Sequence, residues 1–544
     1  METTGIAQEQ TGWISIKAKK LTVILLLLCF VSFGATRLIR IWSSDEEYLV
    51  THFEDDAYFY LTIARNVINN DQLSFDGINS TNGFHPLWLA SIVTIFGSSD
   101  NSITAMKMTG SMSVVLMVLA GLLGLMYIKN RYSILTTIIC TLLLLRYVRD
   151  FSAMSMETSL LLPLLIGGLV VLDGFVINDR PRRYLLLGIM MSVIVMTRLD
   201  AVLICLLMFM VLILRLKRES EMRTGRAVVL LVSPPALVIL FYVLVNVVFF
   251  GTAMSVSGSM KSSFLTFNGL FARQLFLLSD PLGLRSPWGL YLLFLILALI
   301  SCSVYVLKRI KHQEVNGIWK SPASLSVSIF IVLFTLGYLF NSNWRLWAWY
   351  SYPAVLFTVF GLPPILRWTG RTIDKHLKIT FWNPNTNVPA VFAGVGLLIL
   401  SAIWGYSYPK PTSDNFRCMN MAIANQLNNE LDPEAIVAMG DRAGSFSYFF
   451  DGHVVQMEGL VGNSIMLKFI EKGNLEGFLN SMGVDYVLSY TGPADVTDYE
   501  EWGLLVPNSA QSAMKPNTLY VNSNNEIHRW NSGANTVMMW DWTQ

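Results

Sequence analysis

Three acidic residues in a row, Glu54, Asp55 and Asp56, follow the first long apolar run and begin an aromatic-rich helical pattern that continues to about Val67. One helix cap needs only one acid, and acids in a first turn favour the helix dipole by about 0.3–1 kcal/mol. Three adjacent carboxylates repel one another, which raises their proton affinity and suits a general base. The stretch therefore fits both a helix start and a base that takes a proton from a hydroxyl group.

The helical spacing separates the two aspartates. At about 100° per residue, Asp55 shares a polar face with Thr62 and Asn66, whereas Asp56 points elsewhere. We expect an amphipathic helix that lies along the outer membrane surface, with Asp55 directed away from the lipid.

Other polar residues with chemical potential lie in turns or near the ends of apolar runs. Candidates to contact a substrate are Asn82, His85, Glu157 and Asp200. Candidates to bind an anion are Arg149, Arg198, Lys261 and Arg345. Ionisable groups at membrane depth are functional candidates by default. Arginine and lysine at span ends also often extend to the lipid head groups, and Arg149/Asp150 and Arg198/Asp200 could be local structural pairs.

Lys261 and Arg198 are the strongest of the cationic candidates. Lys261 lies in the small-residue stretch SVSGSMKSS, which could surround a phosphate, and Arg198 is accompanied by Asp200 close to the expected membrane boundary. The aromatic residues of NWRLWAWYSY, at positions 343–352, fit a sugar-stacking surface or, more simply, the Trp/Tyr belt of a membrane interface.

The elements that must position these residues are membrane helices. The 544 residues are 53% hydrophobic and 14% charged, which indicates a polytopic membrane protein. A net charge of +2 gives no case for nucleic-acid binding. The five cysteines form no CxxC or Cys/His cluster, so neither a disulfide scaffold nor a zinc site is indicated. The N-terminal apolar run is long enough to span and precedes no small-residue cleavage site, so we expect a retained helix.

Eleven apolar runs are candidate membrane spans. They lie near residues 21–42, 103–128, 131–148, 155–177, 183–197, 199–215, 227–250, 287–307, 324–341, 345–366 and 388–407. With a cytoplasmic N-terminus, every basic loop then falls on the cytoplasmic side, as the positive-inside rule requires. The apolar piece Pro86–Phe96 is too short to span, and we expect an interfacial or re-entrant helix. This topology predicts a first outer loop at 43–102.

The chain after residue 407 changes character. AIVAMG, HVVQME and VDYVLSY have the pattern of strands, and NSIMLKFIEKGNLEGFLNSMG has that of a helix. Alternating strands and helices predict a small extracytoplasmic α/β domain at 408–544, after a transmembrane module at 1–407.

The first outer loop, DDAYFYLTIARN followed by FDGINSTNGFHPLW, resembles that of GT-C membrane glycosyltransferases, as do SMET at 155–158 and GDRAGSFSYFFDGHVVQMEGLVGN at 440–463. The form is similar to the bacterial arabinofuranosyltransferase-like and PMT-like branches. The resemblance implies a GT-C fold, a sugar donor on polyprenyl phosphate, and a catalytic aspartate in the first outer loop. By position this is Asp55, with Asp56 as the second acid.

In the implied reaction, an acceptor hydroxyl attacks the anomeric carbon, with inversion, and Asp55 accepts its proton. Lys261, Arg198, Arg149 and Arg345 would face the leaving phosphate. Asp441 and Glu458 could contact the acceptor or serve only as turn residues. Asp55 and Asp56 could bind a divalent ion through oxygen ligands, but two adjacent acids are too few to define a metal site. No other cofactor is implied.

The resemblance further implies a protein of the bacterial inner membrane, in contact with membrane lipid, whose active site lies on the periplasmic side. The acceptor is left open between a cell-envelope glycan, a glycolipid and a protein. Two other function classes also fit: a transporter or flippase of lipid-linked sugars, although the two halves of the chain do not match as paired repeats would, and a non-catalytic glycan-assembly protein.

Overall fold

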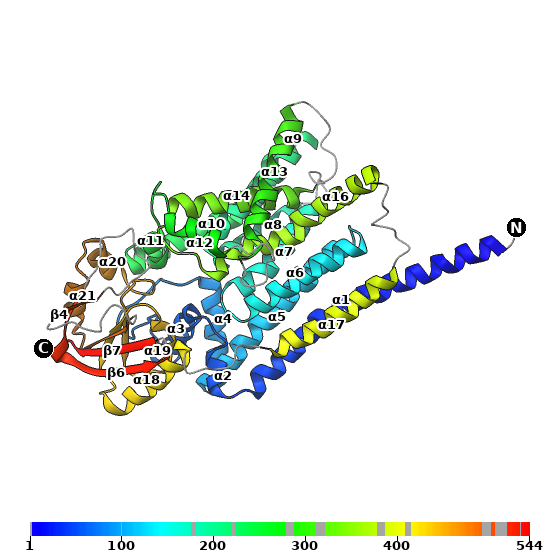
Figure 1. The fold of residues 1–544 in the computed structure, drawn as a ribbon. Coiled ribbons are helices and arrows are strands. Elements are labelled where there is room, and N and C mark those ends of the chain that lie inside the picture. Colours follow the sequence, from blue (N-terminus) through cyan, green and yellow to red (C-terminus); the bar gives the residue numbers. More distant parts are fainter. Residues whose placement is uncertain are drawn as a thin grey trace.

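The computed structural model describes residues 3–99, 101–175, 181–219, 224–278, 288–310, 321–377, 387–407, 415–491, 502–505, 519–533 and 535–543. Helices dominate the part of the chain before residue 408 (Figure 1). The elements there are α1 (Thr3–Ser43), α2 (Glu46–Val50), α3 (Asp55–Asn70), α4 (Pro86–Gly97), α5 (Ser102–Lys129), α6 (Ile134–Ser152), α7 (Thr158–Asp173), α8 (Pro181–Thr197), η1 (Leu199–Ala201), α9 (Val202–Glu219), α10 (Thr224–Val245), η2 (Asn246–Phe250), α11 (Val256–Lys261), α12 (Gly269–Leu278), α13 (Tyr291–Ile310), α14 (Pro322–Asn341), η4 (Ala348–Ser351), α15 (Tyr352–Leu356), η5 (Phe357–Gly361), α16 (Leu362–Leu377) and α17 (Asn387–Tyr406).

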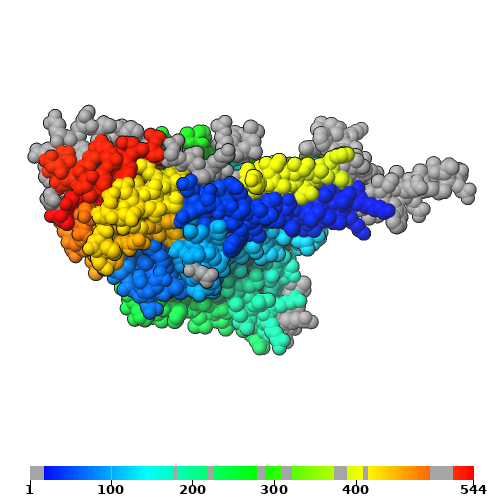
Figure 2. All heavy atoms as spheres, turned by 90° about the horizontal axis from the view of Figure 1, so that it is seen from below, coloured from blue at the N-terminus to red at the C-terminus, as the bar shows by residue number. Residues whose placement is uncertain are grey.

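Within the described residues, seven helices are long and apolar enough to cross a membrane. They are Lys17–Ser43, Ser102–Lys129, Leu199–Leu216, Gly225–Phe250, Tyr291–Lys308, Pro322–Asn341 and Pro389–Tyr406. Helices α1 and α17 lie side by side along one face, as Figure 2 also shows. The chain is therefore a polytopic helical membrane protein, as its composition predicts.

The other four predicted spans are also helical, but they differ from an ideal span in length or regularity. Helices α7 and α8 have 16 and 17 residues, and α6 carries three charged residues in its last two turns. The run 345–366 is divided into 3-10, α and π turns around Pro353. The count of eleven spans stays a prediction, and parts of several basic loops that support it, including residues 178–180, 220–223 and 311–313, lie outside the described residues.

The segment 43–102, which the predicted topology makes the first outer loop and which keeps that name below, holds α2, α3 and α4. Nine of the sixteen residues of α3 are buried, because α4 and the C-terminal part of the chain pack on it. The helix is therefore enclosed by protein rather than lying free along a membrane surface, which is a correction to the sequence-based expectation. Helix α4 begins at Pro86, as predicted, since a proline at the first helical position loses no hydrogen bond.

The C-terminal part forms a mixed five-stranded sheet with the order β2-β1-β3-β7-β6. Its strands are β1 (Ile436–Met439), β2 (His453–Gln456), β3 (Tyr486–Thr491), β6 (Glu526–Ser532) and β7 (Asn535–Asp541), beside a separate pair, β4 (Trp502–Leu505) and β5 (Leu519–Asn522). Strands β2, β1 and β3 are parallel, whereas β7 is antiparallel to both β3 and β6. The helices are α18 (Phe416–Glu430), α19 (Ala443–Phe449), α20 (Ser464–Glu471) and α21 (Leu475–Met482), with a turn, η6 (Ser523–Asn525), before β6.

The three strands predicted from AIVAMG, HVVQME and VDYVLSY are β1, β2 and β3. The helix predicted over 463–483 is two helices, α20 and α21, because Gly473 takes a positive φ of 69° between them. The predicted domain boundary near residue 408 lies outside the described residues.

The C-terminal sheet and its helices lie at one end of the molecule, against the first outer loop (Figure 1). Two glycines show how closely the parts approach. A Cβ at Gly83 would lie 2.1 Å from the Leu460 carbonyl oxygen, and one at Gly444 would lie 2.2 Å from the Asp55 carbonyl oxygen. Any larger side chain at these positions would separate the first outer loop from the C-terminal part.

Candidate functional site

A cavity of about 460 Å³, which we call the first cavity, lies where the segment 43–102 meets the ends of several helices. Its wall has two parts. The charged or ionisable residues are Asp56, His85, Glu157, Arg198, Asp200 and Lys261, and the apolar residues include Leu199, Leu203, Met254, Leu333 and Phe334. A cavity of this size with few polar groups in an apolar wall is typical of a small-molecule site.

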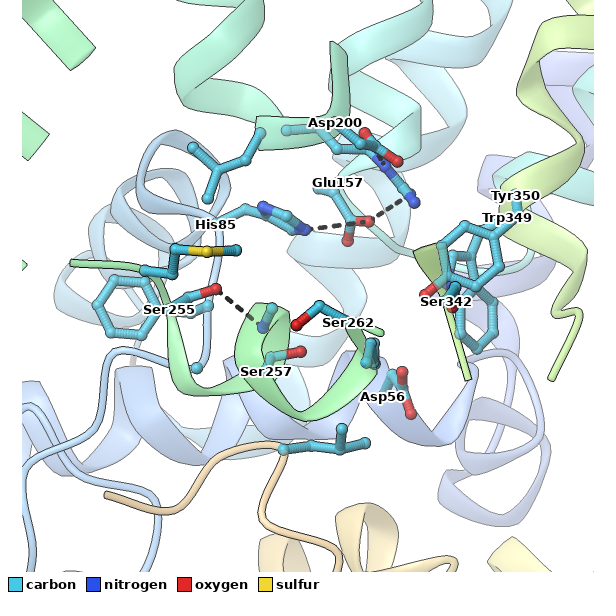
Figure 3. Close-up of a pocket in the computed structure, with 18 of the residues that line it drawn as sticks. Asp56, His85, Glu157, Asp200, Ser255, Ser257, Ser262, Ser342, Trp349 and Tyr350 are labelled. Atoms are coloured by element: carbon cyan, nitrogen blue, oxygen red, sulfur yellow. Dashed lines mark hydrogen bonds and ion pairs between the residues drawn. The ribbon is translucent and has the colours of Figure 1, made fainter. Parts of the chain in front are cut away.

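Glu157 and His85 lie together on one side of this cavity (Figure 3), and Arg198 joins them through its ion pair with Glu157. We call this set the charged group. Arg198 Nη1 donates to Glu157 Oε1 at 2.8 Å, and Arg198 Nε donates to Asp200 Oδ1 at 2.8 Å. His85 Nε2 lies 3.8 Å from Glu157 Oε1. Because Glu157 and Arg198 are nearly inaccessible to solvent, each requires the other as a partner.

The local backbone holds Glu157 in place. The SMET stretch turns at Ser155, whose φ is 51°, and Glu157 then occupies the position just before α7, with its side chain directed to other partners. A serine in the left-handed region costs roughly 1–2 kcal/mol and persists only where the surrounding packing imposes it. Tyr60 of α3 donates from its hydroxyl to Glu157 Oε2 at 3.3 Å. The strained turn therefore ties α7 to the first outer loop.

Asp56 and Lys261 border the same cavity from α3 and α11. In Figure 3, Asp56 lies across the cavity from Glu157, beyond Ser262 and Ser342. Burial raises the pKa of Asp56 to about 7, although the Lys261 ammonium acts in the opposite direction. A carboxylate with a pKa near the working pH is suited to accept and release a proton.

Asp55 has a different environment. Its carboxylate accepts hydrogen bonds from Gly444 N at 2.8 Å, Ser445 N at 2.9 Å and Ser445 Oγ at 2.7 Å. Burial raises the pKa of Asp55, although these hydrogen bonds favour its charged form. The residue thus fills the N-terminus of α19 and does not line the first cavity.

Asn82 positions the helix that carries Lys261. Its amide nitrogen donates to Asn246 Oδ1 at 2.6 Å, and its Oδ1 accepts from Val256 N at 2.9 Å, at the start of α11. Lys261 lies at the other end of α11, with Nζ 5.6 Å from the centre of the Trp344 ring. Asn82 does not line the first cavity, so the structure gives it a supporting position.

The remaining two cationic candidates lie away from the first cavity. Arg149 pairs with Asp150, Nη2 to Oδ1 at 2.7 Å, and packs over the Trp404 ring. Arg345 lines a second cavity of about 300 Å³ between residues 344–349 and the C-terminal part. Asp56, Phe59, Trp349 and Leu460 line both cavities. Asp56 therefore lies between two neighbouring spaces.

Three tyrosines complete the charged group, and one of them, Tyr338, was not singled out from the sequence. Tyr338 donates from its hydroxyl to Asp200 Oδ2 at 3.3 Å, and Arg198 packs over the rings of Tyr350 and Tyr352. Tyr350 and Tyr352 belong to the aromatic run interpreted mainly as a membrane belt. Their proximity to Arg198 depends on the packing of α14 against both α9 and α15, for which the sequence carries no local signal.

Among the described residues, no group of three or more His, Cys, Asp or Glu side chains is arranged to hold a metal ion.

No family model and no curated protein matches the sequence. Among solved structures, the crystal structure of ArnT from Cupriavidus metallidurans in the apo state is similar over 98% of both chains, with a TM-score of 0.49 and 12% sequence identity. At that level of similarity, the function has to be argued from the site itself.

Proposed function

We propose that this protein is a membrane glycosyltransferase of the GT-C type, which transfers a sugar from a polyprenyl-phosphate donor to a hydroxyl of an extracytoplasmic acceptor. The observation that carries the proposal is the position of Asp56. It borders a cavity that combines Lys261 with an apolar wall, and its pKa is about 7. A lipid-linked sugar phosphate needs both an apolar surface for its chain and a cation for its phosphate.

The reaction we infer is a single displacement. The acceptor oxygen forms a bond to the anomeric carbon while the bond from that carbon to the phosphate oxygen breaks, and the phosphate leaves with the electron pair. Asp56 accepts the acceptor's proton. Lys261 stabilises the charge that develops on the leaving phosphate. The configuration at the anomeric carbon is thereby inverted.

Asp56 replaces Asp55 as the preferred base because of where the two carboxylates lie. The base must reach the acceptor hydroxyl within hydrogen-bond distance. Three hydrogen bonds already occupy Asp55, which borders only the second cavity, whereas Asp56 borders both cavities. Arg198 supports the donor site through its pairs with Glu157 and Asp200. His85 contributes a neutral imidazole, because burial lowers its pKa. Arg149 has no part in this proposal.

The proposal includes placement in a bacterial inner membrane with eleven spans, the active site and the C-terminal part facing the periplasm. The acidic and aromatic residues of the first outer loop, which resemble those of arabinofuranosyltransferase-like enzymes, favour a pentofuranosyl donor.

The test is sugar transfer by the purified full chain from a panel of polyprenyl-phosphoryl pentoses and hexoses, with a cell-envelope fraction as acceptor. Wild type is compared with Asp56→Asn and Asp55→Asn. We expect transfer from one donor and a loss of at least about a hundredfold for Asp56→Asn, in line with the contribution of a general base. Equal activity of Asp56→Asn and wild type would overturn the assignment of the base.

A second measurement separates the other function classes. The full chain in vesicles is tested for movement of the labelled donor between leaflets. Movement without transfer would show a flippase, and donor binding with neither movement nor transfer would show a non-catalytic assembly protein.

A further inference from the structure

The second cavity has its own chemistry, which the proposed donor site does not use. It lies on the other side of Asp56 and is enclosed by the segment 344–349, the start of α18, and the loops after β1 and β2. Its lining contains three tryptophans, Trp344, Trp347 and Trp349. A ligand in this space would be next to Asp56 but separate from Lys261, which lines only the first cavity.

Two of the tryptophans are stacked on each other, and both line this cavity. The rings of Trp347 and Trp349 are nearly parallel, at 4°, with centres 5.5 Å apart, so the two indoles overlap with an offset. Trp349 is buried and Trp347 is partly exposed. Rigid aromatic surfaces of this kind give a large contact area at low cost in side-chain entropy. The C–H face of a sugar ring is a matching apolar surface.

The charges around this pair argue against an anionic ligand. The lining contains five acids and three arginines. Even where burial favours the protonated forms of Asp56 and Glu458, the other three acids match the three arginines in number, so the cavity has no excess of positive charge. Arg417 is paired with Glu54, and Arg442 donates to Asn535 Oδ1 at 3.0 Å and packs over the Phe416 and Tyr490 rings. These two arginines are thus held by other parts of the chain. A phosphate or carboxylate ligand would meet more acids than cations.

Two acids of the C-terminal part are suited to hydroxyl groups instead. Asp441 and Glu458 both line the cavity, from the loops after β1 and β2. Gln456 Nε2 donates to Glu458 Oε2 at 3.1 Å, which fixes the Glu458 carboxyl group. Burial raises the pKa of Glu458 well above its usual range, which favours the protonated form, and a protonated carboxyl group both donates and accepts hydrogen bonds.

We propose that the second cavity binds the acceptor, and that the acceptor is the hydroxyl-rich end of a neutral saccharide packed against Trp347 and Trp349. Its attacking hydroxyl would reach Asp56 from the side opposite the donor. The role as acceptor rests on the proposed function, whereas binding of the saccharide does not require the donor. The inference narrows the acceptor from glycan, glycolipid or protein to a neutral carbohydrate.

The experiment measures binding by calorimetry to the full chain in nanodiscs, without donor. The probes are neutral oligosaccharides (arabino-, manno- and gluco-tetraoses), an acidic oligosaccharide, and a Ser/Thr-rich peptide. We expect at least one neutral probe to bind, and Trp347→Ala to weaken that binding at least about tenfold, since a stacked aromatic contact is lost. Trp347→Phe should restore part of the affinity because a flat ring remains.

A matched control is Trp368→Ala, since Trp368 is 60% exposed on α16 and lines neither cavity. It should leave saccharide binding unchanged. Binding of undecaprenyl phosphate, measured on the same preparations, should be equal in Trp347→Ala and wild type, which shows that the first cavity is intact.

The inference is overturned if no neutral probe binds at up to about 20 mM, a range that includes weak millimolar sites, or if the acidic probe or the peptide binds more tightly. Transfer of sugar to a peptide would contradict this inference and leave the glycosyltransferase proposal standing. Saccharide binding sensitive to Trp347, in a protein that transfers nothing, would contradict the proposed function and leave the binding site standing.

Discussion

Asp55 and Asp56 are neighbours in the chain, but their carboxylates serve different parts of the molecule. Asp55 accepts three hydrogen bonds from Gly444 and Ser445 at the start of α19 and borders only the second cavity, whereas Asp56 borders both cavities. One residue joins the first outer loop to the C-terminal part while the next is presented to the space between them. This connection fixes the direction of Asp56, because a shift of α3 would move both carboxylates together.

Replacing Asp55 should therefore loosen the C-terminal part more than it impairs proton transfer. In Asp55→Asn, an amide can no longer accept from both Gly444 N and Ser445, and leaving a buried donor unsatisfied costs about 1–3 kcal/mol. We expect a lower melting temperature and faster hydrogen exchange over 443–449. Asp451→Asn, at an exposed position of the same part, is the control. A melting temperature and exchange equal to those of wild type would show that the three hydrogen bonds do not hold α19.

The pH dependence of transfer should follow Asp56. A general base must be deprotonated, so the rate should rise with pH through a pKa of about 7 and level off above it. Lys261 lowers the pKa of Asp56 from the value that burial alone would give. Lys261→Met should therefore move this rise to higher pH, besides reducing the maximal rate, and Lys261→Arg should keep it near that of wild type. The measurement is kcat/KM between pH 5 and 9, and a profile unaltered by Lys261→Met would exclude the electrostatic link.

The local pattern of α3 predicted a helix with Asp55 on its polar face, and both features are present. The pattern could not show what covers that face, because the contact joins Asp55 to Ser445, 390 positions later. Helical spacing states which residues share a side but not which distant segment packs there. The preference for Asp55 as base followed from position in the chain, and the geometry that favours Asp56 arises only in the tertiary fold.

The charged candidates show the same limit. Arg149 and Arg198 look alike in sequence, since each lies near the end of an apolar run and has an aspartate one or two positions away. In the structure Arg198 packs between Glu157 and two tyrosines beside the first cavity, whereas Arg149 packs on Trp404 of α17. The difference depends on which helices are neighbours, and hydrophobic periodicity does not determine this.

The two arginines give a matched comparison. Arg198 uses two different nitrogens to hold Glu157 and Asp200 at once, and the single ammonium of lysine does not reproduce this geometry. Arg198→Lys should lower the melting temperature and raise the KM for the donor several-fold, as expected when roughly 1–2 kcal/mol of a charge-assisted contact is lost. Arg149→Lys should leave the donor KM within about twofold of wild type, which is less than about 0.5 kcal/mol. Equal effects of the two changes would contradict the placement of the donor beside Arg198.

Gly337 offers a test of the apolar part of the first cavity. It lies on α14 between Leu333 and Asn341, which line the same wall, and a Cβ at Gly337 would meet no atom within 4 Å. Gly337→Leu should therefore fold normally and fill space that we assign to the polyprenyl chain. We expect transfer from a full-length donor to fall at least about tenfold, the effect of roughly 1.4 kcal/mol, and transfer from a donor truncated to two isoprene units to fall less.

Gly396→Leu is the matched control for this steric test. Gly396 is also in an apolar helix, α17, and a Cβ there would likewise meet no atom within 4 Å, but the residue lies outside both cavities. A leucine at this position should leave the KM for both donors unchanged, since it removes no space from the first cavity. If Gly337→Leu accepted the long donor as well as Gly396→Leu does, the lipid chain would have to follow another path, and the wall formed by α9 and α14 would not be part of the donor site.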